Sequence, residues 1–408
     1  MLYPRVSLYA LMLAAAGIPL YIHLPQFASV NLGIGLGALG GILLAIRMFD
    51  LIQDPVIGWI VGKWPRAQAA FAVLACGGLA IGFPLLFNLQ DGPAATTNLI
   101  LILLLLFSAY SLGMILLYGR SATLAKRTAP SELLTLAAFR ELGMLCGVIL
   151  AAIAPSVFVA FGAANQGYPV FGLTLGAVAI CVAIATYGMW TRPVVASRAL
   201  TIAGLTDSGA LRLLGLAVLN SLPVALTSTL FLFFVQDYLD LPTLAGPLLV
   251  LFFLCAALSV PLWTRVSQRI GPKQTLLIAM PLAIASFAGT FFLGPGDVLA
   301  FALICVASGA ALGADMTLLP AMFSISLTNA GLDASTAFGI WSFSGKLALA
   351  LAAAFALPVL DYSGFRPGGD NTNTASMTLL YAYAVLPCFL KITAFGFATT
   401  LPSERTTP

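Results

Sequence analysis

Residues 99–117 read LILILLLLFSAYSLGMILL, a stretch without a single charged side chain. A helix needs about 20 mostly apolar residues to cross the hydrocarbon core of a bilayer. Similar stretches recur along the chain, in which 61% of the 408 residues are hydrophobic and 8% are charged. Soluble domains contain about 25% charged residues, so we expect lipid to surround most of this chain.

The apolar stretches predict twelve membrane-spanning helices joined by short connections, and no sizeable soluble domain. Their centres lie near Ala14, Leu43, Leu79, Leu105, Ile149, Val178, Ala225, Phe252, Ala283, Cys305, Leu349 and Leu390. They divide six and six around the longest connection. We therefore predict an all-α membrane protein with two pseudo-symmetric six-helix bundles: residues 1–191, a linker of residues 192–210, and residues 211–408.

The charges in the connections predict the orientation. If the N-terminus is cytoplasmic, the cytoplasmic connections and the termini carry Arg5, Lys63, Arg66, Arg120, Lys126, Arg127, Arg192, Arg198, Arg212, Arg265, Arg269, Lys273 and Arg405. The opposite connections carry one basic residue, Arg366, and several acids: Asp91, Asp240, Asp297, Asp361 and Asp370. Because cytoplasmic loops are enriched in Lys and Arg, both termini are predicted to be cytoplasmic, in a multi-pass protein of a bacterial inner membrane.

Several classes of protein are not expected from this sequence. The six cysteines fall inside the predicted spans without a C-x-x-C pair, which predicts neither disulfides nor a metal site. There is no HExxH or GxSxG motif, so no enzyme is predicted. The glycine-rich runs follow no strand and are not expected to bind nucleotide phosphates. We expect no cofactor and no nucleic-acid partner.

The second span holds charges inside an apolar helix, in IRMFDLIQDPVIGWIVGKW (residues 46–64). Arg47, Asp50 and Asp54 fall on one face of such a helix. A charge at the centre of a bilayer costs about 2.5–3.5 kcal/mol on insertion scales. Two carboxylates one turn apart repel unless a cation or a proton lies between them. These residues predict a site for Na⁺ or H⁺; the alternative is a structural Arg–Asp pair that locks two helices.

Two neighbours add oxygen ligands to this predicted site. Pro55 has no N–H group, so the carbonyl oxygen of Leu51 lacks its helical donor. Gln53 supplies an amide oxygen on an adjacent face. Oxygen atoms are the ligands that hard cations prefer, so both residues favour a cation site over a purely structural pair.

Charged residues also lie in the fifth and eleventh spans. Arg140 and Glu141 are adjacent and point about 100° apart, so we expect them to face different partners, with Arg140 lining a cavity and Glu141 pairing elsewhere; the alternative is that both are structural. Lys346 is the strong cation deep in the second half and is expected to neutralise the acids of the second span; the alternative is that it snorkels to an interface. Trp341 and Ser342, about one turn earlier, are expected to touch a solute.

Three other polar residues carry weaker expectations. Lys391 lies toward the cytoplasmic end of the twelfth span and is expected to snorkel. We predict no role for Asp315, which lies in the tenth span. His23, at the outer end of the first span, is expected to be a helix-end residue; a proton relay is the alternative.

The second span resembles a known family. Arg47, Asp50, Asp54, Pro55 and Gly58 match every fixed position of R-x-x-D-x-x-x-D-P-x-x-G. This is the second-helix signature of the glycoside–pentoside–hexuronide:cation symporters, the family of melibiose permease. The resemblance extends over twelve spans and a lysine on the eleventh, and it implies the major facilitator fold.

The resemblance implies roles for individual residues. The coupling Na⁺, Li⁺ or H⁺ would be bound by Asp50, Asp54, Gln53 and Ser111, and the matching cavity and coupling positions are Tyr110, Met114, Tyr118, Arg140 and Lys346. From the spans themselves we expect Arg47 and Trp341 to belong to the same set. Tyr118 stands where the family has the aromatic ring that stacks on the sugar. Ala14 and Met114 stand where melibiose permease has its sugar-binding acids, so the resemblance covers the cation site better than the sugar site.

We therefore predict a secondary active transporter that couples Na⁺ or H⁺ to symport of a sugar, glycoside or similar organic solute by alternating access. The alternative is a lysolipid or amphiphile transporter, or an efflux carrier, on the same fold. The sequence leaves open the solute, the coupling ion and the direction of transport. We expect a monomer in contact with lipid, because the cavity lies within one chain.

Overall fold

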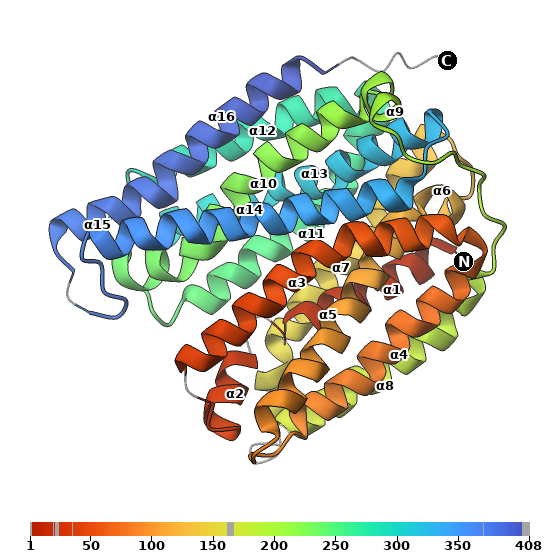
Figure 1. Ribbon diagram of the computed structural model, residues 1–408. Coiled ribbons are helices and arrows are strands. Elements are labelled where there is room, and N and C mark those ends of the chain that lie inside the picture. Colours follow the sequence, from red (N-terminus) through yellow and green to blue (C-terminus); the bar gives the residue numbers. More distant parts are fainter. Residues whose placement is uncertain are drawn as a thin grey trace. The chain divides into compact units, whose positions relative to one another are not determined.

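A computed structural model describes residues 2–18, 20, 24–34, 36–160, 167–369 and 371–401; His23 lies outside them. These residues form helices and connections, with an isolated β-bridge between Arg198 and Leu332. Figure 1 shows the helices in chain order. They are α1 (Leu2–Ile18), α2 (Leu24–Asn31), α3 (Leu36–Lys63), α4 (Gln68–Phe87), α5 (Ala95–Gly119), α6 (Ser121–Leu124), α7 (Pro130–Ala160), α8 (Gly167–Trp190), α9 (Ile202–Asp207), α10 (Ala210–Phe233), α11 (Ala245–Ile270), α12 (Pro272–Thr290), α13 (Val298–Asn329), α14 (Ala334–Tyr362), α15 (Asn373–Leu380) and α16 (Leu386–Thr399).

The predicted spans correspond to these helices. Each of the twelve expected centres lies inside a helix. Nine helical segments of the described chain are long and apolar enough to cross a membrane. The other three centres lie in α1, which has 17 described residues, in α12, which has 19, and in α3, which contains the charged residues of the second span. The prediction of an all-α membrane protein is confirmed.

The chain folds into two compact units. Unit 1 comprises Met1–Leu200 and Gly331–Phe343, and unit 2 comprises Thr201–Ala330 and Ser344–Pro408. The first change of unit falls within the predicted linker, where Thr201 caps α9 by accepting a hydrogen bond from the Gly204 N–H group. The second falls inside α14, which therefore begins in unit 1 and ends in unit 2. The predicted bundle boundaries at residues 191 and 211 stay a prediction.

Small residues bring α1 and α7 into backbone contact in unit 1. A Cβ atom added at Gly143 would lie 2.2 Å from the Ser7 carbonyl oxygen, and one at Gly147 would lie 2.3 Å from the Leu11 carbonyl oxygen. The Ser7 hydroxyl also donates to the Phe139 carbonyl oxygen at 2.5 Å. Membrane helices associate through such close contacts because burial of apolar surface gains little in lipid.

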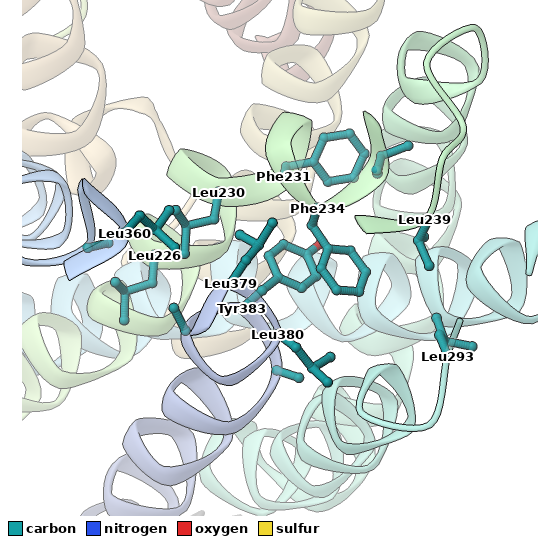
Figure 2. Packing of buried hydrophobic residues seen from close by; sticks show 14 of the residues in the cluster. Leu226, Leu230, Phe231, Phe234, Leu239, Leu293, Leu360, Leu379, Leu380 and Tyr383 are labelled. Carbon is teal, nitrogen blue, oxygen red and sulfur yellow. The ribbon is translucent and has the colours of Figure 1, made fainter. Parts of the chain in front are cut away.

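Unit 2 contains a core of aromatic and aliphatic side chains. Its centre is the ring of Phe234 stacked on Tyr383, with centroids 4.1 Å apart and planes 9° apart. Figure 2 shows these two rings among the surrounding leucines. Each ring lies in a π-helical segment: η3 (Phe234–Tyr238), which continues α10, and η4 (Tyr381–Val385), which joins α15 to α16. The two π-helical segments thus meet in this core.

Candidate functional site

The predicted acids of α3 are buried in unit 1. Asp54 has no exposed surface, and Asp50 is 4% exposed. They lie one helical turn apart in a helix that continues through Pro55, so their Cβ atoms are about 6 Å from each other. Two carboxylates are therefore buried on adjacent turns of one membrane helix.

Asp50 is held by an amide and a hydroxyl group. Its Oδ1 atom accepts hydrogen bonds from Gln53 Nε2 at 2.8 Å and from Ser111 Oγ at 2.9 Å. Gln53 Oε1 in turn accepts from Ser108 Oγ at 2.8 Å. The arrangement connects α3 with α5, and it brings together three of the four residues that were predicted to bind the cation.

Asp54 is held from α14. The Ser342 hydroxyl donates to Asp54 Oδ2, so Ser342 contacts the acid that was expected to bind a cation. The two helices can meet because glycines face each other where they cross. A Cβ atom at Gly339 would lie 2.7 Å from the Asp54 carbonyl oxygen, and one at Gly58 would lie 3.0 Å from Gly339 Cα. Gly58, the last fixed position of the second-helix motif, thus permits the contact with α14.

A second buried group of charges lies on α5 and α7. Arg140 Nε donates to Glu141 Oε1 at 2.9 Å, and the Tyr118 hydroxyl donates to the same oxygen at 2.8 Å. The guanidinium also covers the Tyr118 ring, with its Cζ atom 3.6 Å from the ring centroid. The expectation that Arg140 and Glu141 face different partners is wrong. Their long side chains bend toward each other. The Tyr118 hydroxyl contacts Glu141, and the Tyr118 ring contacts Arg140.

Aromatic rings connect this group with the start of α14. The Tyr118 ring lies 5.5 Å from Phe338, which lies 6.0 Å from Trp341. Trp341 directly precedes Ser342, the partner of Asp54. The ionic group around Arg140 and the α3 acids therefore lie at two ends of one chain of contacts in unit 1.

Comparison with known proteins identifies the chain. Residues 6–403 match a family described as MFS/sugar transport protein. The chain is a member of this family. A search of curated proteins finds no match.

The transporter is also similar to solved structures of the major facilitator superfamily. The fucose:proton symporter of E. coli has a TM-score of 0.72 at 17% identity, over 98% of both chains. A bacterial homologue of the iron transporter ferroportin has a TM-score of 0.72 at 15% identity, over 98% of this chain and 100% of that chain. The human organic anion transporter MFSD10 has a TM-score of 0.68 at 15% identity, over 97% and 98%. These likenesses show the fold. Together with the family they identify a multi-pass secondary transporter of a small-molecule solute, and not an enzyme.

The remaining predicted residues of the transporter are more dispersed. Arg47 is exposed, and Met114 is half-buried on α5. Tyr110 is half-buried, and its hydroxyl lies 3.6 Å from the position that a Cβ atom would take at Gly17 of α1. Lys346 is half-buried in the part of α14 that belongs to unit 2. The pairing of Arg47 or Lys346 with the α3 acids stays a prediction.

Unit 2 of the transporter contains a charge pair that contradicts a prediction. Lys391 of α16 is 3% exposed, and its ammonium donates to Asp315 of α13 and, at 2.5 Å, to Asn220 Oδ1 of α10. The expectation that Lys391 snorkels to the membrane surface is wrong, because a carboxylate and an amide within the unit replace the water that snorkelling would reach.

The first turn of α14 in the transporter is fixed by an acid and lies near a buried arginine. Asp333 accepts hydrogen bonds from the N–H groups of Ser335 at 3.2 Å and Thr336 at 3.1 Å, as an N-cap does. Arg120 donates to the Val61 carbonyl oxygen at 2.5 Å, near the end of α3. Burial lowers the pKa of the Arg120 guanidinium, and the charge of Asp333 opposes that shift. An arginine remains protonated under such conditions, so it supplies a fixed positive charge beside α14.

The sequence did not predict the roles of two hydroxyl groups in this network: Ser108, which donates to Gln53, and Ser342, which donates to Asp54. Ser108 lies three residues before Ser111 on the same face of α5, and that spacing could have suggested it. Ser342 was noticed, but as a residue that touches a solute. Its contact with Asp54 joins positions 288 residues apart, a separation at which one sequence carries no signal of pairing.

Proposed function

We propose that this chain is a cation-coupled symporter that carries Na⁺ or H⁺ together with a sugar, glycoside or similar organic solute. The observation that supports it best is the pair of buried carboxylates, Asp50 and Asp54, on adjacent turns of α3. Gln53, Ser111 and Ser342 surround them with amide and hydroxyl groups. Carboxylate, amide and hydroxyl oxygens are suitable ligands for a hard cation.

Electrostatics gives this pair a reason to bind a cation. Two unit charges about 6 Å apart repel by roughly 3 kcal/mol at an effective dielectric constant of about 20. The repulsion is relieved when a monovalent cation lies between the carboxylates or when one of them is protonated. A purely structural network would be expected to contain one acid, since a second acid adds this repulsion.

The hydrogen bond from Ser342 suggests how the cation is coupled to movement. Ser342 is on the part of α14 that belongs to unit 1, and Lys346 follows four residues later in the part that belongs to unit 2. Binding of Na⁺ or H⁺ at Asp54 changes the net charge beside the first turns of α14. Such a differential interaction is what a ligand needs in order to shift an equilibrium between two conformations.

The class of solute rests on the family and on the resemblance to glycoside–pentoside–hexuronide:cation symporters. The similar structures carry different solutes by their descriptions, a fucose, iron and an organic anion among them. Ala14, at a position where melibiose permease has a sugar-binding acid, is buried against α7: a Cβ atom at Gly147 would lie 2.9 Å from Ala14 Cβ. No solute contact is expected there. That packing favours the alternative of a lysolipid or amphiphile carrier, which needs fewer polar contacts; an efflux carrier remains a further alternative.

The same proposal includes the location of the protein. The basic residues in alternate connections favour cytoplasmic termini in a bacterial inner membrane. In this orientation the connection before α14, which contains Asp333, is cytoplasmic. We expect a monomer without a cofactor other than the coupling ion.

The experiment that tests coupling needs no known solute. The apparent melting temperature of the purified protein is measured in Na⁺ and in choline at equal ionic strength, for the wild type, Asp54→Asn and the control Asp91→Asn, whose carboxylate is in an exposed connection. A ligand at ten times its Kd adds about 1.4 kcal/mol to the free energy of unfolding. We expect Na⁺ to stabilise the wild type and Asp91→Asn but not Asp54→Asn.

A proton site gives a different result in the same assay. If Na⁺ has no effect, the three proteins are compared over a range of pH, and Asp54→Asn is expected to lose a pH dependence that the other two share. Coupling at the α3 acids is refuted if neither Na⁺ nor pH distinguishes Asp54→Asn from the wild type. Accumulation of a soluble glycoside in proteoliposomes, compared with movement of a lysolipid, then distinguishes the two classes of solute.

A further inference from the structure

We propose that Asp315, Lys391 and Asn220 form a proton-exchange site in unit 2, separate from the acids of α3. In this site the Asp315 carboxylate takes up and releases a proton while Lys391 leaves and rejoins it. The three residues come from α13, α16 and α10, and each is at least 93% buried. Neither the family nor the resemblance assigns a role to them.

The depth of the cluster in the membrane helices makes it unusual. Lys391 lies eight residues before the end of α16, and Asn220 lies ten residues after the start of α10, which correspond to about 12 Å and 15 Å along a helix. Asp315 lies near the middle of α13 (Val298–Asn329). Ionisable groups at such depth are expensive and usually belong to ion or proton pathways.

One oxygen of the Asp315 carboxylate is buried without a hydrogen-bond partner in the described part of the chain. Asp315 Oδ2 accepts from Lys391, whereas Oδ1 is buried and has no hydrogen-bond partner in the described part of the chain. A buried acceptor without a donor costs about 1–3 kcal/mol. Asp315 Oδ1, which has no donor among the described residues although it belongs to the carboxylate that Lys391 contacts, is therefore the atom to which water can deliver a proton.

The proton step is balanced within these residues. A proton from water binds Asp315 Oδ1, so that the carboxylate becomes a neutral carboxylic acid and its ion pair with Lys391 is lost. The Lys391 ammonium keeps its hydrogen bond to Asn220 Oδ1. The cluster gains one positive charge, and release of the proton restores the pair. Because the pair links α13 to α16, its loss removes a connection between two helices of unit 2, which gives proton binding an effect on conformation.

Other titratable groups lie on these helices or on other helices of the same unit. They include Cys305 on α13; Cys388, whose Sγ donates to the Ile284 carbonyl oxygen; Lys273, which donates to the carbonyl oxygens of Thr399 and Leu401; Arg212, Arg265 and Arg269 near helix ends; and Lys346 within α14. Lys391 is the charged group that bonds Asp315 among the described residues.

Infrared difference spectroscopy of the purified full chain tests the proposal, with the proton as the only ligand. Spectra are compared between mildly alkaline and mildly acidic buffer. We expect a carbonyl band of buried carboxylic acids to appear in the wild type on acidification and to be weaker in Asp315→Asn, in which only the other buried acids, such as those of α3, contribute to it. The control Asp237→Asn removes a carboxylate near the end of its span, one that accepts from the Gly368 N–H group, and should retain the band.

Lys391→Met makes the test independent of the folding of Asp315→Asn. Without the ammonium, the charge beside the Asp315 carboxylate is gone, so the pH midpoint at which the band appears should differ from that of the wild type. If Asp315→Asn does not fold, the double variant Asp315→Asn with Lys391→Met replaces it, because it leaves no buried charge alone. A wild type without the band, a band whose intensity is unchanged by the loss of Asp315, or a midpoint that Lys391→Met leaves unchanged would each overturn the proposal. None of these results affects the Na⁺ test of Asp54.

Discussion

The contact between α3 and α14 leads to the most direct test of the structure. In Gly339→Ala, the new Cβ atom would lie 2.7 Å from the Asp54 carbonyl oxygen, 3.1 Å from Gly58 Cα and 3.3 Å from Pro55 Cα. All three are backbone atoms, so no side chain can rotate away. An ordinary contact begins near 3.4 Å, and the helices must separate by about 0.7 Å.

The expected energy follows from two opposing effects. Overpacking of this kind costs about 1–3 kcal/mol, whereas replacing Gly by Ala inside a helix gains about 1 kcal/mol. We therefore expect Gly339→Ala to lower the free energy of unfolding by up to about 2 kcal/mol. Because Ser342 lies one turn further along α14, the separation should also weaken its hydrogen bond to Asp54 and reduce any stabilisation by the cation.

The matched control is Gly345→Ala in the same helix. A Cβ atom at Gly345 meets nothing within 4 Å, so this variant should gain the helix contribution of about 1 kcal/mol without a clash. The assay is thermal unfolding of both variants and the wild type in the same detergent, at one heating rate, with and without Na⁺. If Gly339→Ala is as stable as Gly345→Ala, the close approach of α3 and α14 is refuted.

Two further predictions concern buried side chains of unit 1. Arg140→Met leaves the Glu141 charge buried without its ion-pair partner and should lower the free energy of unfolding by about 3–5 kcal/mol. In the double variant with Glu141→Gln, thermal unfolding should show that most of this stability is recovered. If Arg140→Met alone is as stable as the wild type, the pairing is contradicted. Ser111→Ala removes a hydrogen bond to the Asp50 carboxylate worth about 1.5–3 kcal/mol. This variant should show a smaller increase in melting temperature on addition of the coupling ion, Na⁺ or H⁺. The control Thr174→Ala, in which the lost hydroxyl bonds a carbonyl of its own helix, should show the full increase, and equal behaviour of the two variants would argue against Ser111 as a ligand.

The sequence alone determined the class of protein and the position of its central acids. Long apolar stretches can only be helices in a membrane, because a helix satisfies its backbone hydrogen bonds within one segment. Each expected span centre lies in a helix for that reason. Asp50, Asp54, Gln53 and Gly58 are within three turns of one helix, and helical periodicity fixes their relative directions. Local geometry therefore made this part of the site predictable.

Only the tertiary structure decided which distant side chains pair. Ser342 reaches Asp54 because two glycines let α14 approach α3, and Lys391 stays inside the protein because Asp315 on another helix receives it. From sequence, a buried lysine and a snorkelling lysine are the same residue in the same apolar context. Arg140 and Glu141 share Tyr118 because flexible side chains can reverse the directions in which their Cβ atoms point. Partner choice across helices depends on packing distances, and a single sequence carries no direct record of those distances.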